Sequence, residues 1–366
     1  MSKMAMMPSF SPPRFNRARR ITPSPYCCTS PPAGAAAAQE YSNNSNNVGD
    51  GGFMIASASS GLRWHVVDTV RNCLYGEVLR AVEVEHGGYF AVKQMSLERI
   101  HSMDARNSSE DPLKEVAALQ FLKTYGPHPN VIEVVEALQD NAYIYVVLPF
   151  CTGDELFSVV SANRGLSENA ARPIFRGLLA GMAFLHNLQI CHRDMSLENI
   201  LLAEGGLVKI IDFGMALRLE QPPGPTGGGA AAFDGSSDGS GGGSASASYR
   251  GARSISPTGP FGKRHYMPPE VAMNAQDYDG FSVDVWACGV IMFITLAGIP
   301  PFHIPIPAQD ERCQFIAVER RLLELVRGWE LNLSEEVVSL IQACLIFNPN
   351  ERSSVCQLLD HPWLAL

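Results

Sequence analysis

Three polar side chains on two short stretches of this sequence could carry chemistry together. Asp194 and Asn199 lie on one polar stretch, and Asp212 directly follows the apolar pair Ile210-Ile211. A carboxylate beside a hydroxyl can accept its proton, and Mg²⁺ prefers hard oxygen ligands such as carboxylate and amide oxygens. One base and two metal ligands around a triphosphate would support phosphoryl transfer.

Strands and a helix are expected in the first half of the chain. Residues 76–82 run to a Gly87-Gly88 turn and residues 89–93 return, which predicts a hairpin. Residues 112–123 carry apolar side chains at helical spacing, with Pro112 suited to a first helical turn. Two further strands are expected, one through Val134 and one from Tyr143 to Leu148. Together these patterns predict a five-stranded antiparallel sheet with one helix.

Helices dominate the pattern after Gly153. Residues 168–186, with Ser167 as a cap, are expected to be helical, as are residues 283–297 and 335–347. The longest apolar run, residues 285–302, is interrupted by Gly and Pro and is short for a bilayer. It predicts a buried helix, and no membrane span is expected.

Composition excludes some classes of function. The net charge of −9 argues against nucleic-acid binding, because phosphate neutralisation needs clustered Lys and Arg. The nine Cys include no C-x-x-C pair, so neither a disulfide framework nor a zinc spacing is indicated. A reduced compartment, the cytoplasm or the nucleus, is therefore expected.

Two segments have the composition of flexible chain. Residues 1–60 are rich in Ser, Pro, Ala and Asn and are expected to form a disordered tail. Their Arg-rich, acid-poor first part is also typical of an organelle transit peptide, so both interpretations stay open. Residues 221–259 are rich in Gly and Ser, contain no G-x-x-x-x-G-K-[ST] pattern, and are expected to be a flexible insertion.

Residues 192–199 and Asp212-Phe213-Gly214 resemble the catalytic loop and the metal-binding motif of eukaryotic protein kinases of the Ser/Thr type. The resemblance extends from about Val66 to Leu366, and His361-Pro362-Trp363 resembles the ending of the calcium/calmodulin-dependent-like group. It implies an α+β fold of two lobes within residues 61–366: a small antiparallel-sheet lobe with one helix, about residues 64–150, and a larger, mainly helical lobe, about residues 151–366. The segment 221–259 would lie in the activation loop. The implied activity is transfer of the γ-phosphate of ATP, with Mg²⁺, to protein substrates.

The resemblance also implies a role for individual residues. Asp194 would be the base, and Asn199 and Asp212 the Mg²⁺ ligands. Lys93 would contact the α- and β-phosphates, with Glu115 fixing its position. Asp284 would hold the catalytic loop, and Glu270 would pair with Arg352. The implied nucleotide-binding residues are Val70, Gly76, Val78, Ala91, Lys93, Glu115, Pro149, Cys151, Glu155, Leu201 and Asp212.

Several positions depart from the family pattern. Only Gly76 remains of the three glycines of the phosphate-covering loop, Ser196 stands where Lys is usual, and Lys263 stands where Thr is usual. We hypothesise that Lys263 takes over the work of the missing lysine, with Ser196 supplying the hydroxyl, while a solvated Lys263 is the alternative. The same departures keep open a pseudokinase that binds or scaffolds without catalysis.

Overall fold

The computed structural model describes residues 14–21, 53–102, 111–219, 254–255, 261–275 and 277–365. The chain divides into two compact units, each with both helices and strands. The first, called the sheet unit, comprises residues 14–104 and 133–150. The second, called the helical unit, includes residues 105–132 and 151–366. The chain is thus of the α+β class.

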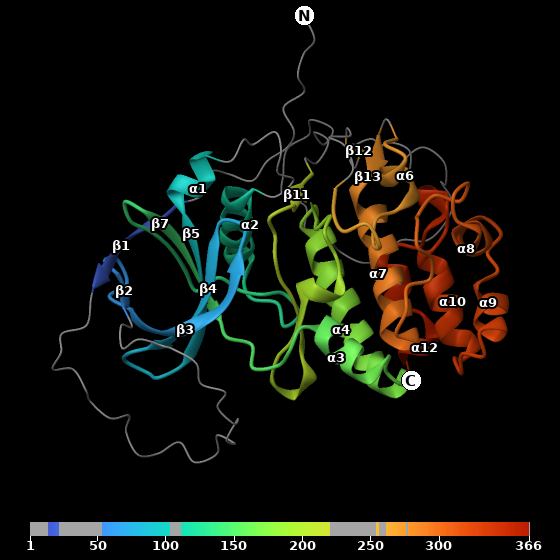
Figure 1. Cartoon of the computed structure of the whole chain (residues 1–366), viewed down its shortest axis with the longest axis horizontal. Helices are drawn as coiled ribbons and strands as arrows, with labels where there is room; N and C mark the ends of the chain where they lie inside the picture. Colours follow the sequence, from blue (N-terminus) through green and yellow to red (C-terminus); the bar gives the residue numbers. More distant parts are fainter. Residues whose placement is uncertain are drawn as a thin grey trace, which may run out of the picture. The chain divides into compact units, whose positions relative to one another are not determined.

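The sheet unit is built around an antiparallel sheet in the order β2-β3-β4-β5-β7-β6, with β1 pairing on β2 (Figure 1). Burial alternates along β4, as a sheet with one face on a core requires. That core includes Trp64, Leu79, Val92 and Tyr145. The predicted hairpin is confirmed as β4 and β5. The elements are β1 (Asn16–Ile21), β2 (Met54–Ser57), β3 (Arg63–Cys73), β4 (Gly76–Glu83), β5 (Tyr89–Ser96), α1 (Leu97–Ser102), β6 (Glu136–Gln139) and β7 (Tyr143–Pro149).

Strands β1 and β2 lie within the region expected to be a disordered tail. Ala18 and Ile55 are buried in the sheet-unit core. The buried carboxylate of Glu136 accepts hydrogen bonds from Asn16 Nδ2 and Ser57 Oγ, each at 2.7 Å. The prediction of a disordered tail was based on composition averaged over sixty residues. It missed these strands because their pairing and burial involve only a few apolar positions. Residues 1–13 and 22–52 lie outside the described part of the chain.

The helical unit packs its helices around α7, which lies between α4 and α10 (Figure 1). Among the described residues, α7 is the one helix that is both long enough and apolar enough to cross a membrane. Most of it is buried inside the protein. The helices are α2 (Pro112–Tyr125), α3 (Leu156–Asn163), α4 (Glu168–Asn187), α6 (Pro269–Ala272), α7 (Gly280–Ala297), α8 (Glu311–Cys313), α9 (Leu322–Gly328), α10 (Glu335–Cys344), α11 (Val355–Leu359) and α12 (Pro362–Ala365). The short strands are β8 (Ile190–Cys191), β9 (Ile200–Leu202), β10 (Val208–Ile210), β11 (Leu217–Arg218), β12 (Ser254–Ile255) and β13 (Tyr278–Asp279).

The predicted helix α2 groups with the helical unit rather than with the sheet, which differs from the expected lobe boundaries. Its N-cap Asp111 donates its backbone N–H to the carbonyl of Gly214 at 3.2 Å. The guanidinium of Arg218 lies 4.2 Å from the ring centre of Phe121 on α2. These contacts join residues distant in sequence, so helical periodicity alone could not reveal them.

The structure changes the bounds of two predicted elements and adds a strand to a segment expected to be a flexible insertion. The strand expected through Val134 is β6, which begins at Glu136. Helix α10 ends at Cys344 and not at residue 347, because the chain leaves helical geometry at Leu345. Most of the Gly/Ser-rich segment 221–259 lies outside the described residues, but Ser254 and Ile255 form β12, which pairs with β13.

The predicted pair of Glu270 and Arg352 is confirmed. Arg352 Nη1 and Nη2 donate to the two carboxylate oxygens of Glu270 at 2.6 and 2.7 Å. Such a two-pronged contact fixes orientation as well as charge. The pair therefore ties α6 to the segment that precedes α11.

Glu168, at the start of α4, joins two distant parts of the helical unit. Its carboxylate accepts from the backbone N–H and the hydroxyl of Ser334 and from Trp363 Nε1, at 2.6–2.7 Å. Burial raises the pKa of Glu168, but these hydrogen bonds outweigh it, so the pKa lies below its ordinary value of 4.5. A depressed folded-state pKa contributes stability above pH 4.5 and loses it as pH falls further.

We therefore expect Glu168→Gln to lower the melting temperature at neutral pH, and the gap to the parent protein to close below pH 4.5. Thermal unfolding followed across a pH series measures this gap. Glu336→Gln, an exposed carboxylate on α10, is the matched control and should show no such gap. A Glu168→Gln gap that stays constant into acid would contradict the prediction.

Candidate active site

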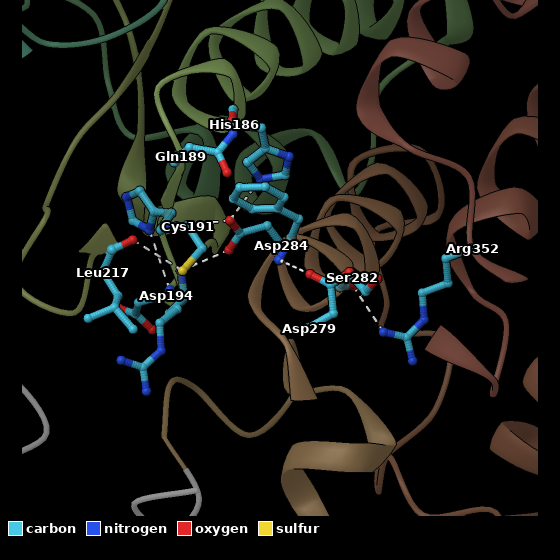
Figure 2. A network of polar contacts seen from close by, with 12 residues as sticks. His186, Gln189, Cys191, Asp194, Leu217, Asp279, Ser282, Asp284 and Arg352 are labelled. Atoms are coloured by element: carbon cyan, nitrogen blue, oxygen red, sulfur yellow. Dashed lines mark hydrogen bonds and ion pairs between the residues drawn. The ribbon is translucent and has the colours of Figure 1, made fainter. Parts of the chain in front are cut away.

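The buried carboxylate of Asp284, on α7, organises the loop that follows β8 (Figure 2). Its Oδ2 accepts from the backbone N–H of His192 at 2.8 Å and contacts His186 Nε2 at 3.0 Å. Its Oδ1 accepts from the backbone N–H of Arg193 at 2.8 Å. The prediction that Asp284 holds this loop is confirmed.

Asp194 and Asn199 are joined directly. Asn199 Nδ2 donates to the backbone carbonyl of Asp194 at 2.7 Å and to its Oδ2 at 2.9 Å. Asn199 is buried at the end of a single 3₁₀ turn, Leu197–Asn199, whose turn brings its side chain back toward Asp194. Because both bonds use Nδ2, the amide oxygen of Asn199 is not spent on them.

Asp212 reaches the same loop through a two-stranded ribbon. Strands β9 and β10 pair antiparallel, and the chain continues from β10 into Ile211 and Asp212. Ile211 donates its backbone N–H to Asn199 O at 3.0 Å, and its carbonyl contacts His192 Nε2 at 3.0 Å. Asp212 has a left-handed backbone with φ 64°, an uncommon conformation for a residue with a side chain. The ribbon thus brings Asp212 beside Asp194 and Asn199.

The charges at this loop fit a divalent cation. Burial, together with repulsion from Asp212, raises the pKa of Asp194, against the opposing attraction of Lys263 and His192 and the hydrogen bond from Asn199. Asp194 and Asp212 are therefore close enough to repel each other, and a cation would relieve that repulsion. Mg²⁺ commonly takes only one or two protein carboxylates and completes its shell with phosphates and water. Asn199 and Asp212 match that donor set.

Lys263 extends into this loop from the segment before α6. Its Nζ donates to Ser196 Oγ at 2.7 Å and lies 3.4 Å from Glu198 Oε2. Ser196 is fully buried, while the Lys263 side chain is 40% exposed. The ammonium also acts on the Asp194 carboxylate, whose pKa it lowers. The Lys263 ammonium therefore contacts Ser196 and Glu198, although part of its side chain is exposed.

In the sheet unit, strand register places several predicted residues on one face. Val78 is directly opposite Lys93, and Arg80 is opposite Ala91, so Val78, Ala91 and Lys93 share a face. Val70 lies at a register shift between β3 and β4 and is half exposed. Each of these residues lies on the sheet, and the Asp194 loop belongs to the helical unit.

Gly76 has a packing reason of its own. A Cβ added at Gly76 would lie 1.9 Å from the backbone oxygen of Gln94 on β5, an overlap that no side chain could relieve. The close approach of β4 to β5 thus requires glycine here whether or not a phosphate passes nearby. The family resemblance alone would assign this glycine only to nucleotide binding.

The remaining predicted residues are divided between the units. Pro149 ends β7 in the sheet unit, and Cys151 begins the second stretch of the helical unit. Glu155 precedes α3, and its backbone forms an isolated antiparallel β-bridge with Leu201 on β9. Burial raises the pKa of the Cys151 thiol. Glu115 is buried on α2 in the helical unit, whereas Lys93 lies in the sheet unit.

Sequence patterns missed three residues around this loop. His186 contacts the carboxylate of Asp284 through its Nε2 atom. Phe261 and Tyr278 hold the side chain of Arg193. None of them stands at a regular spacing from the catalytic loop, so no local signal could have found them.

The family model for the protein kinase domain matches residues 64–364. The chain belongs to the protein kinase family. Curated relatives of this kinase chain include CBL-interacting protein kinase 31 of Oryza sativa subsp. japonica, 28% identical over 81% of this chain and 56% of that protein. Calcium-dependent protein kinase 21 of Arabidopsis thaliana is 27% identical over 79% of this kinase chain and 47% of that protein. The serine/threonine-protein kinase SRK2C of Arabidopsis thaliana is 30% identical over 64% and 59%. The kinase chain thus spans about half the length of the curated relatives it matches.

Proposed function

We propose that this protein is a Ser/Thr protein kinase that transfers the γ-phosphate of ATP to hydroxyls of protein substrates. The observation that carries the proposal is the joined arrangement of Asp194 and Asn199, with the loop held by Asp284 and with Asp212 beside it. Family membership and the names of the relatives, several of them serine/threonine kinases, support the same activity.

Each side chain of the loop has a distinct task in this reaction. Asp194 accepts the proton of the substrate hydroxyl and orients it toward the γ-phosphate. Asn199 and Asp212 would hold Mg²⁺, which would neutralise phosphate charge. Asn199 also restrains Asp194 through two hydrogen bonds, so the base is oriented before the substrate binds.

The nucleotide contacts are proposed on the basis of the family resemblance and the face shared by Val78, Ala91 and Lys93. Lys93 would bind the α- and β-phosphates and Glu115 would orient it. We propose that the sheet unit and the helical unit correspond to the small and large lobes of the kinase fold. The other nucleotide contacts in this proposal are Val70, Gly76, Pro149, Cys151, Glu155 and Leu201.

Lys263 is proposed to supply the cation that the family usually places at position 196. The 2.7 Å bond to Ser196 Oγ and the attraction to Asp194 support this role. A cation beside a transferring phosphoryl group stabilises charge that develops in the transition state.

The deciding experiment incubates the purified full chain with radiolabelled ATP, Mg²⁺ and a generic basic protein substrate. Incorporation of label that the Asp194→Asn variant lacks supports the proposal. Nucleotide binding without any incorporation of label would favour the pseudokinase. The altered glycine loop and Ser196 are the sequence features that support that alternative.

The acidic residues Glu155 and Glu198 lead to a prediction about which peptide sequences the kinase prefers. In basophilic relatives the positions of Glu155 and Glu198 read an upstream Arg, while Ile294 stands where a third acid sometimes lies. We expect a modest enrichment of Arg at the −3 position of a positional peptide library, and Glu155→Gln should reduce it. Glu198 already lies 3.4 Å from Lys263 Nζ, which is one reason to expect a modest effect. A library without basic enrichment at −3 would refute the assignment.

A further inference from the structure

The side chain of Arg193, next to Asp194 in the chain, is held by two aromatic residues. Its Nη2 donates to the hydroxyl of Tyr278 at 3.0 Å, and its guanidinium carbon lies 4.0 Å from the ring centre of Phe261. The two rings are themselves 5.3 Å apart. Burial raises the pKa of Tyr278 to about 12, so the phenol is neutral and accepts an ordinary hydrogen bond from the cation.

Both aromatic residues are anchored in the core of the helical unit. Phe261 is 6% exposed and Tyr278 4% exposed, and both belong to one hydrophobic cluster with Cys191 and Leu217. Tyr278 also lies on β13, which pairs with β12 at Ile255. Their positions are therefore set by packing, and they can hold Arg193 without any added group.

Arg193 needs such support because its backbone is strained. Its φ of 68° is left-handed, and such conformations persist only where the surroundings impose them. Asp284 holds its backbone N–H at 2.8 Å, and the two aromatic residues hold the other end of the same residue. Because Asp194 is the next residue, holding Arg193 at both ends also fixes the direction of the Asp194 carboxylate.

We propose that Phe261 and Tyr278 are positioning residues that fix Arg193, and through it Asp194, without a phosphate on the activation segment. The inference rests on the proposed kinase activity. The family resemblance instead makes a phosphorylated loop residue the partner of Arg193, with Ser256 and Thr258 as candidates, and both lie outside the described residues. Within the described part of the chain, Arg193 Nε is buried without an acceptor, so an added anion is the competing occupant.

The first test uses the full chain treated with a phosphatase, freed of that enzyme, and shown by intact mass to carry no phosphate. We expect phosphorylation of a peptide substrate to begin without a lag, at the initial rate of protein pre-incubated with ATP. Activity only after pre-incubation would overturn the inference and leave the kinase proposal standing. Inactivity in both preparations would instead remove the kinase proposal, and the inference with it.

The second test removes each contact. Phe261→Leu, which loses the ring face, and Tyr278→Phe, which loses only the hydroxyl, should each lower kcat about 3- to 30-fold with KM for ATP unchanged. Phe261→Tyr retains the ring and should keep the parent kcat. Phe315→Leu is the matched control, because it removes another Arg–aromatic contact, 4.3 Å from Arg321, and should leave kcat unchanged.

A double-mutant cycle separates positioning from general packing. In an Arg193→Met background, Phe261→Leu and Tyr278→Phe should cause no further loss of kcat, because their effect passes through Arg193. Additive losses, measured per folded molecule, would show that the rings act only on the fold and would overturn the inference. Tyr278→Phe keeps the packed ring, so the cycle can be read even if Phe261→Leu fails to fold.

Discussion

Asp194→Asn is expected to reduce phosphoryl transfer about 10²- to 10⁴-fold, the usual contribution of a positioned base, while the protein stays folded. An amide cannot accept the substrate proton. The fold should tolerate the change because Asn199 Nδ2 keeps its 2.7 Å bond to the backbone carbonyl at position 194. Initial rates with radiolabelled ATP, together with a melting curve for each protein, measure both effects.

Lys93→Met tests the same reaction from the sheet unit and should abolish transfer, a larger effect than that of Asp194→Asn, because positioning and charge stabilisation supply almost all of this catalysis. Lys114→Met is the matched control: Lys114 is an exposed lysine that pairs with Asp111 at 3.7 Å. It should keep the parent rate. Near-parental turnover in Asp194→Asn or in Lys93→Met would remove the role proposed for that residue.

Lys263→Ala is expected to lower kcat about tens- to a thousand-fold, the range for losing one electrostatic donor at a developing charge. The ammonium is held within 2.7 Å of Ser196 Oγ and acts on Asp194, so its loss removes a cation from beside the base. Steady-state kinetics should place the loss in kcat rather than in KM for the peptide. Arg264→Ala, at the adjacent exposed residue, is the control and should leave kcat unchanged.

Exchanging the two positions gives a sharper test of the same idea. The double variant Ser196→Lys with Lys263→Thr restores the arrangement usual in the family and should recover much of the activity lost in Lys263→Ala. Recovery requires that the cation, not the particular residue at 263, does the work. Full activity of Lys263→Ala alone would end the exchange hypothesis, and the altered loop would then reflect tolerance or partial loss of function.

Local sequence patterns were sufficient to predict those helices and strands whose apolar side chains repeat at a regular spacing. The hairpin of β4 and β5 and the helices α2, α4 and α7 were predicted from alternation, helical spacing and caps, since such signals lie within a few residues. The family motifs likewise predicted that Asp284 would hold the catalytic loop and that Glu270 would pair with Arg352.

Other features depended on contacts between residues far apart in the chain. The sequence by itself determined which residues could do chemistry, and it led to the hypothesis that Lys263 replaces the missing lysine. Only the tertiary structure placed its ammonium on Ser196, grouped α2 with the helical unit, and brought Phe261 and Tyr278 onto Arg193. The physical reason is that side-chain packing and long-range hydrogen bonds leave no periodic trace in the sequence.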